Sequence, residues 1–171
     1  MNKTIEQVKE FHETFNHPVG DLTVLEPLAT RQLRIKLIFE ELQELAEASN
    51  CMKTLYLLCT KLTDDCDEDN PEDGDNVNQL EELDALCDIQ YVLNGKILTA
   101  GMQEIFDKNF ELVHSNNMSK AHTDEAHALQ TIDKSQSTLG FHKQGEYYIV
   151  TNKDGKIIKP WDHQKVALSL T

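Results

Sequence analysis

Residues 31–48 read RQLRIKLIFEELQELAEA, a stretch in which apolar residues recur every three or four positions. That spacing is typical of an amphipathic α-helix. At about 100° per residue, Glu40, Glu44 and Glu47 fall within roughly 60° of one another on this helix. Glu41 lies about 60° beyond Glu44. For this helix taken alone, a solvated acidic face is the favoured interpretation, because stacked carboxylates repel one another unless a cation lies between them.

Residues 78–100 read NQLEELDALCDIQYVLNGKILTA and predict a second helix with carboxylates on one face. Glu81, Asp84 and Asp88 lie within roughly 60° of one another on that helix. The leucines on another side predict that much of the helix is buried in a bundle. Buried carboxylates bind a metal, pair with cations or take up protons. Because cations are few near both helices, we expect a divalent metal, and all-oxygen ligands favour Mg²⁺ or Mn²⁺.

Helical periodicity continues on both sides of these two segments. The predicted helices cover about residues 4–15, 30–49, 51–62, 78–100, 102–114 and 123–136, with Thr4 and Thr30 as expected N-caps. Near the C-terminus, strands at 147–150 and 157–158 are predicted to flank a turn at 152–155. The expected fold class is therefore all-α, a helical bundle of four to five main helices with a small C-terminal β-hairpin appendage. We expect residues 1–120 to form a helical metal-binding catalytic domain, and residues 121–171 to form an extension docked on it.

The negative charge of the chain is concentrated in one internal window. The formal net charge is −14, and the window from Glu40 to Asp88 contains 16 acidic residues and two lysines. With no cluster of basic residues, the chain is not expected to bind a nucleic acid polymer. No segment is apolar enough for a signal peptide or a membrane span, and no CxxC spacing indicates zinc or disulfides. We therefore expect a cytoplasmic protein with reduced thiols.

The acidic loop at residues 64–75 is a competing metal site within this window. An EF-hand register starting at Asp65 places Asn70 where glycine is required. A register starting at Asp69 places Pro71 at a ligand position and Leu80 where the bidentate glutamate belongs. Neither register fits, so the loop is predicted to be solvated.

Three segments together resemble a known superfamily. They are EELQE at 40–44, EELDALCDIQYV at 81–92 and HSNNMSK at 114–120. In combination they are similar to the all-α nucleoside triphosphate pyrophosphohydrolases, which include MazG-like enzymes, dimeric dUTPases and phosphoribosyl-ATP pyrophosphohydrolases. The resemblance covers about residues 5–120 and leaves out the predicted hairpin.

The resemblance implies a metal-dependent hydrolase that converts a nucleoside triphosphate to the monophosphate and pyrophosphate with Mg²⁺ or Mn²⁺. dUTP is the leading substrate that it suggests. Carried over residue by residue, the implied site consists of Glu40 as catalytic base, of Glu41, Glu44, Glu81 and Asp84 as metal ligands with Asp88 as a further ligand or support, and of Asn117, Lys120, His114 and Tyr91 as substrate-binding residues.

Two further expectations follow from the residues. The apolar stretch at 86–100 is too wide for a small monomeric bundle to cover, so we expect a homodimer or homotetramer. The alternative function is a non-catalytic acidic helical module that binds cations or a basic partner. That alternative does not require carboxylates on the otherwise apolar face of the second helix. A helix C-terminus is an equally good explanation for His114 and Asn117, and a surface charge is an equally good one for Lys120.

Overall fold

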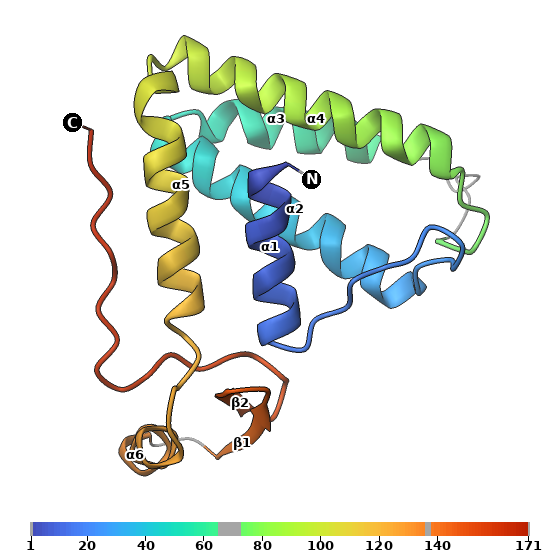
Figure 1. The fold of residues 1–171 in the computed structure, drawn as a ribbon. Coiled ribbons are helices and arrows are strands. Elements are labelled where there is room, and N and C mark those ends of the chain that lie inside the picture. The colour runs from blue at the N-terminus through green and yellow to red at the C-terminus, as the bar shows by residue number, and fades with distance from the viewer. Residues whose placement is uncertain (1, 65–72, 136–137, 171) are drawn as a thin grey trace. The chain divides into compact units, whose positions relative to one another are not determined.

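The structure is a computed structural model that describes residues 2–64, 73–135 and 138–170 (Figure 1). The described elements are α1 (Lys3–Thr14), α2 (Leu28–Ala48), α3 (Met52–Asp64), α4 (Gln79–Thr99), α5 (Gln103–Met118), α6 (Glu125–Lys134), β1 (Leu139–Gln144) and β2 (Tyr147–Asn152). The strands pair in an antiparallel hairpin. The predicted fold class, mostly helical with a C-terminal hairpin, is confirmed.

The chain separates into two compact units. One combines Met1–Val19 with Ala85–Thr171, and the other is Gly20–Asp84. We refer to them as the discontinuous unit and the central unit. The proposed boundary between a catalytic domain at 1–120 and an extension at 121–171 stays a prediction.

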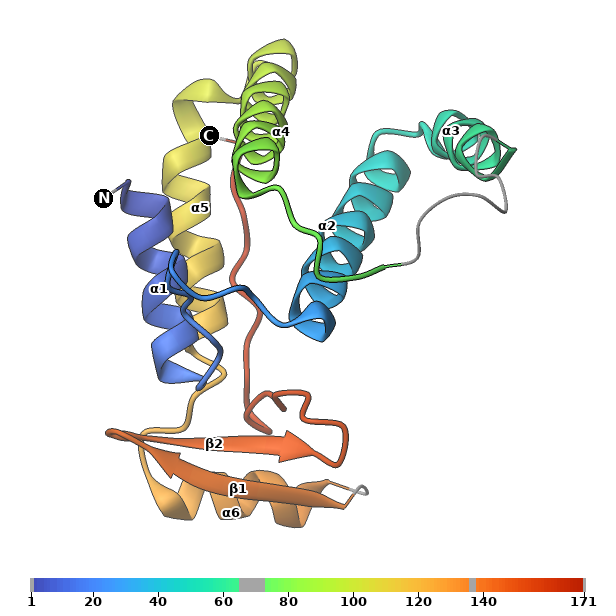
Figure 2. The ribbon, with the colours of Figure 1, turned by 90° about the vertical axis from the view of Figure 1, so that its right-hand side faces the viewer.

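The discontinuous unit is built around two helices and the hairpin. Helix α1 packs along α5, and α6 packs against both strands, as Figures 1 and 2 show. Its core cluster consists of Phe15, Ala121 and Ile149, with Phe11, Met118, Tyr147 and Ile157 packed around it. These residues come from α1 and its C-cap, the end of α5 and the hairpin region, so the predicted appendage packs on a helix that precedes Ile149 by more than 130 residues.

Several local predictions differ from the structure at helix ends. The side chain of Asn2, rather than Thr4, caps α1 by accepting a hydrogen bond from the Thr4 backbone N–H at 3.0 Å. Thr30 lies inside α2, which has Pro27 at its N-cap position. Helix α5 continues to Met118, whereas the predicted helix ends at about residue 114. Packing of Met118 on the core cluster offsets the low helix propensity of the SNN sequence.

The hairpin uses an earlier pair of segments than predicted, because the predicted first strand is the second strand of the structure. Residues 147–150 belong to the second strand, and the turn before it contains Gly145 at φ 58°. The expected turn at 152–155 exists and has Gly155 at φ 78°. The segment after it contributes only one isolated bridge, between Ile157 and Thr151. The prediction missed β1 because LGFHKQ lacks the strong apolar alternation of a half-buried strand.

The C-terminal segment runs in an extended conformation along α5 (Figure 1). The Asn109 side chain donates to the Ser169 carbonyl oxygen and accepts from its backbone N–H, both at 2.9 Å. Two turns further along α5, the Asn116 side chain accepts from the Val166 backbone N–H at 3.2 Å. Leu168 and Leu170 line an apolar cavity of about 330 Å³ with α5.

Helices α2, α3 and α4 leave many large apolar side chains exposed. These are Leu33, Ile35, Leu37, Ile38, Phe39, Leu42 and Leu45 on α2, Met52, Tyr56, Leu57, Leu58 and Leu62 on α3, and Leu80, Leu83, Leu86, Ile89, Tyr91, Val92, Leu93 and Leu98 on α4. Every residue from Gln79 to Asn94 is exposed, so the expected burial of much of this helix in a bundle is not found within one chain. The leucine pattern shows that the helix has apolar faces but does not show what covers them. Among the described residues, no helix is long and apolar enough to cross a membrane.

Candidate functional site

The predicted base and two of the predicted metal ligands lie on α2. Glu40, Glu41 and Glu44 are all exposed on the second half of this helix. Residues three and four positions apart on a helix are neighbours, with Cβ atoms about 5–6 Å apart, so Glu44 lies one turn from each of the other two. Lys36 is one turn earlier, and its Nζ is 3.7 Å from a carboxylate oxygen of Glu40. The ammonium group of Lys36 in this exposed ion pair is the cation that α2 itself supplies to its acidic face.

The remaining predicted ligands lie on α4. Glu81 and Asp84 belong to the central unit, Asp88 lies one turn further along the helix, and all three are exposed. Within the described ranges, no three Asp, Glu, His or Cys side chains approach one another closely enough to hold a metal ion. Each helix therefore presents carboxylates on successive turns, and the described residues of one chain do not bring the two sets together into a metal centre. The donor chemistry suits Mg²⁺, since every candidate ligand is a carboxylate oxygen.

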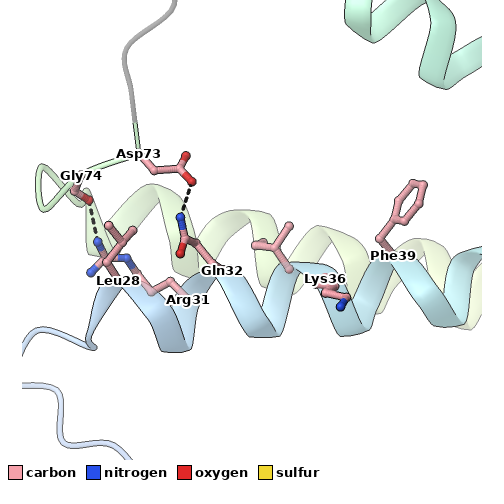
Figure 3. Close-up of a pocket in the computed structure, with 8 residues that line it drawn as sticks. Leu28, Arg31, Gln32, Lys36, Phe39, Asp73 and Gly74 are labelled. Carbon is pink, nitrogen blue, oxygen red and sulfur yellow. Dashed lines mark hydrogen bonds between the residues drawn. The ribbon is translucent and has the colours of Figure 1, made fainter. Parts of the chain in front are cut away.

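A pocket of about 620 Å³ lies on α2 near the described end of the acidic loop (Figure 3). Its apolar wall includes Leu28, Ile35 and Phe39. On the helical wheel these residues lie roughly on the opposite side of α2 from the glutamates. The pocket is therefore not part of the predicted carboxylate site.

Polar contacts at one end of this pocket fix the loop to α2. A guanidinium nitrogen of Arg31 donates to the Gly74 carbonyl at 2.5 Å and lies 3.2 Å from an Asp75 carboxylate oxygen. The Gln32 amide donates to Asp73 at 2.8 Å, as Figure 3 shows. Sequence reasoning did not identify this role of Arg31. The prediction that the acidic loop is solvated concerns mostly residues 65–72, which lie outside the described residues.

The predicted substrate-binding residues fall on two helices. Asn117 and Lys120 contact each other at the end of α5, where the Lys120 ammonium donates to the Asn117 side-chain oxygen at 2.7 Å. His114 lies one turn before Asn117, and its Nε2 is 3.2 Å from a carboxylate oxygen of Glu10 on α1. Tyr91 lies on α4 and is 80% exposed. The structure therefore brings the amide and the ammonium together, and gives His114 a partner on α1.

The sequence profile of the family described as phosphoribosyl-ATP pyrophosphohydrolase matches residues 8–117. That range is well over half of the chain and contains every predicted catalytic and metal-binding residue. The chain belongs to this family. Members of the phosphoribosyl-ATP pyrophosphohydrolase family are typically metal-dependent and act on nucleotides.

A solved structure supports the fold of this family member. A crystal structure from Exiguobacterium sp. 255-15, of a protein provisionally described as an NTP pyrophosphohydrolase, matches with a TM-score of 0.63. The match covers 95% of this chain and 88% of that chain at 21% sequence identity. At that identity the likeness shows the fold. A comparison with curated proteins found no match.

Lys120 and the residues after 120 lie outside the matched range of the family profile, and they bring charges to the end of α5. Burial lowers the pKa of Lys120, and the nearby ammonium groups of Lys159 and Lys156 lower it further. Sequence reasoning missed these two lysines, because some 36 residues separate Lys156 from Lys120 and no motif spans that distance. Only the docking of the hairpin places them together.

Proposed function

We propose that this protein hydrolyses a nucleoside or deoxynucleoside triphosphate to the monophosphate and pyrophosphate. The observation that carries the proposal is the family match, which contains two carboxylate sets on separate helices. Glu41, Glu44, Glu81 and Asp84 would hold Mg²⁺ or Mn²⁺. The bound ion would neutralise phosphate charge and stabilise the charge that develops during attack at phosphorus.

The protein's own groups have distinct tasks in this scheme. Glu40 accepts a proton from the attacking water and holds that water in line with the scissile phosphoanhydride. Asp88 lies one turn after Asp84 and serves as a further ligand or as a support for one. Lys120 supplies a point charge to a phosphate oxygen, and Asn117 supplies amide hydrogen-bonding groups to the same substrate. His114 and Tyr91 complete the proposed substrate-binding set, with dUTP as the first substrate to test.

The proposal includes a homodimer or homotetramer. Exposed leucines along α4 and the other apolar side chains of α2 and α3 form more apolar surface than a soluble monomer commonly leaves uncovered. A second copy that covers these helices would also bring further carboxylates to each set. The described residues of one chain do not gather the two sets by themselves. The oligomer and the metal site would then depend on the same contact.

The direct test is pyrophosphate release from a panel of nucleotides, including dUTP and phosphoribosyl-ATP, with Mg²⁺ or Mn²⁺. Glu41→Gln and Asp84→Asn should each lower kcat about 100-fold or more, because each removes a charged ligand while keeping its shape. Glu82→Gln is the matched control, since it removes a carboxylate from α4 about 100° away from Glu81 on the wheel. No release by the wild-type protein from any nucleotide would refute the proposal, as would full activity in both ligand variants.

Light scattering tests the oligomer independently of activity. The expected mass is two or four times the 19.5 kDa of the chain. The double variant Leu83→Asp/Leu86→Asp should shift the mass to that of a single chain and abolish metal-dependent hydrolysis. A monomeric wild-type protein with full activity would contradict the shared dependence of oligomer and site.

A further inference from the structure

Three lysines of the discontinuous unit lie together at the end of α5. We call Lys120, Lys156 and Lys159 the lysine cluster. Backbone hydrogen bonds join His122 to Tyr148 and Ile158 to Val150 of the same strand, and the Ser119 hydroxyl lies 3.3 Å from Nδ1 of His163, so the segments that carry these lysines meet. In keeping with this, the charges of Lys159 and Lys156 lower the pKa of Lys120. Figure 1 shows the chain after β2 passing the end of α5, which accounts for this meeting of distant segments. All three cations therefore come from outside residues 8–117, the range that matches the family.

The backbone that carries Lys156 and Lys159 is fixed by hydrogen bonds to β2. Asn152 uses its side-chain oxygen to accept from the Lys156 N–H at 2.9 Å, and its own N–H donates to the Lys156 carbonyl at 3.0 Å. The N–H of Ile158 donates to the Val150 carbonyl at 2.8 Å. The lysines thus extend from a held segment rather than from a free tail, so the ordering of the backbone is already achieved before any ligand binds.

Neutral hydrogen-bonding groups border the cluster. Asn117 accepts from Lys120 through its side-chain oxygen, which leaves its amide N–H groups to donate. The Ser119 hydroxyl lies 3.3 Å from Nδ1 of His163. Nε2 of His163 is buried and has no hydrogen-bond partner among the described residues. The Ser119 hydroxyl donates to the Asn116 carbonyl, so it accepts from Nδ1–H of the neutral His163 ring, and Nε2 is then an acceptor. Burial, with the charges of Lys159 and Lys120, lowers the pKa of this imidazole.

The cluster lacks a neutralising carboxylate. In the described part of the chain, no ion pair involves Lys120, Lys156 or Lys159. The charge of Asp162 raises the pKa of His163, against the other effects, but one carboxylate oxygen of Asp162 lies 2.9 Å from Nε2 of His127. One lysine would complement the carbonyl end of α5, whereas three repel one another. A ligand with several negative charges would relieve this repulsion, and a polyphosphate chain has that charge density.

We propose that the lysine cluster of the discontinuous unit binds the phosphate groups of a nucleotide. The inference rests on the proposed function for the identity of the nucleotide. Lys120 and Asn117 are the substrate residues that the superfamily resemblance implies. Lys156 and Lys159 add two charges from a segment that follows the matched range. The extension is in this view a binding element rather than an appendage.

The test measures binding of inorganic tripolyphosphate to the full-length protein by calorimetry, without added metal. The double variant Lys156→Ala/Lys159→Ala should weaken the affinity at least about tenfold, since it removes two cations that would form charge-assisted hydrogen bonds with the anion. The matched control Lys143→Ala/Lys153→Ala removes the same charge from the hairpin, and neither lysine is among the groups that lower the pKa of Lys120. It should change the affinity less than about threefold, because screened surface charges contribute little. Lys156→Arg/Lys159→Arg should restore binding.

A second readout separates a binding role from a structural one. Tripolyphosphate should raise the pKa of Lys120 in the wild-type protein, because a bound anion favours the ammonium form. Equal losses of affinity in both double variants, or no loss in either, would overturn the proposal. Wild-type protein that binds tripolyphosphate through the cluster but hydrolyses no nucleotide would refute the proposed function and leave this site standing. Nucleotide hydrolysis with an unchanged KM in Lys156→Ala/Lys159→Ala would support the proposed function and overturn the phosphate-binding role of the lysine cluster.

Discussion

Replacing His122 with glutamine should flatten the pH dependence of stability in the discontinuous unit. His122 is 1% exposed, and its backbone is held to Tyr148 by hydrogen bonds of 3.0 and 2.8 Å. Its Nε2 lies 2.9 Å from the hydroxyl oxygen of Thr131. That hydroxyl donates to the His127 carbonyl, so it accepts from Nε2–H and the neutral imidazole carries its proton there. Nδ1 is buried with no partner in the described residues.

Protonation of this imidazole would place a charge in a buried site. Burial lowers the pKa of His122 and the charge of His127 lowers it further, while a backbone hydrogen bond with Tyr148 and the charges of Asp162 and Asp124 oppose the shift. Because the folded pKa lies below the unfolded value near 6.5, the unfolded chain binds more protons between the two. The stabilisation is therefore complete above about pH 6.5 and is lost as the pH falls through the folded pKa. One proton gives a slope of at most about 1.4 kcal/mol per pH unit.

Urea unfolding followed by the fluorescence of Trp161, the single tryptophan, reports on this region, since its ring contacts the His127 ring at 6.4 Å between centroids. At pH 7.5, His122→Gln should be about 1–3 kcal/mol less stable than the wild type, because its buried oxygen lacks a donor. At pH 5.5 this gap should shrink by up to about 1.4 kcal/mol. His142→Gln, at an exposed position on β1, should leave the wild-type slope unchanged. A constant gap between pH 7.5 and 5.5 for His122→Gln would refute the argument.

Three further perturbations test the packing of the same unit. Ile149→Ala removes a fully buried core side chain and should lower the unfolding free energy by about 2–5 kcal/mol, whereas Ile5→Ala, at a position 56% exposed, should change it by less than about 0.5 kcal/mol. Asn109→Ala removes both hydrogen bonds to Ser169, so amide exchange of residues 166–170 should accelerate about tenfold or more, and unchanged protection would show that the leucines alone hold the segment. The Asp124 side chain caps α6 by accepting from the His127 N–H at 2.8 Å. Asp124→Ala should therefore lower the unfolding free energy in urea by about 1 kcal/mol, and Asp124→Ser should restore it.

The predicted carboxylate site depends on contacts between helices as well as on spacing within each helix. Helical spacing places Glu41 with Glu44, and Glu81 with Asp84, on successive turns regardless of the rest of the fold. Joining the two sets requires contacts between helices, and the described residues of one chain do not gather three ligands. The proposed oligomer follows from this gap together with the exposed apolar residues, and mass and activity measurements test it jointly.

Local periodicity was sufficient to predict most helices, because a 3.6-residue repeat of apolar positions is a property of neighbouring residues. It was also sufficient to recognise the family, since both acidic motifs are short and lie within single helices. Helix ends were harder to predict. The start of α1 depends on the Asn2 side chain, and the extension of α5 to Met118 depends on packing against the hairpin.

Tertiary structure alone decided which distant groups meet. The pairing of β1 with β2, the burial of Ile149 at 0% exposure and the approach of Lys156 and Lys159 to Lys120 depend on contacts between residues far apart in sequence. The exposure of α4 is of the same kind, because an apolar face is encoded locally but its cover is not. The sequence by itself therefore determined the helices and the carboxylates that they carry. The placement of the cations at the end of α5 was decided by how the C-terminal extension folds back, since long-range packing has no periodic signal in the chain.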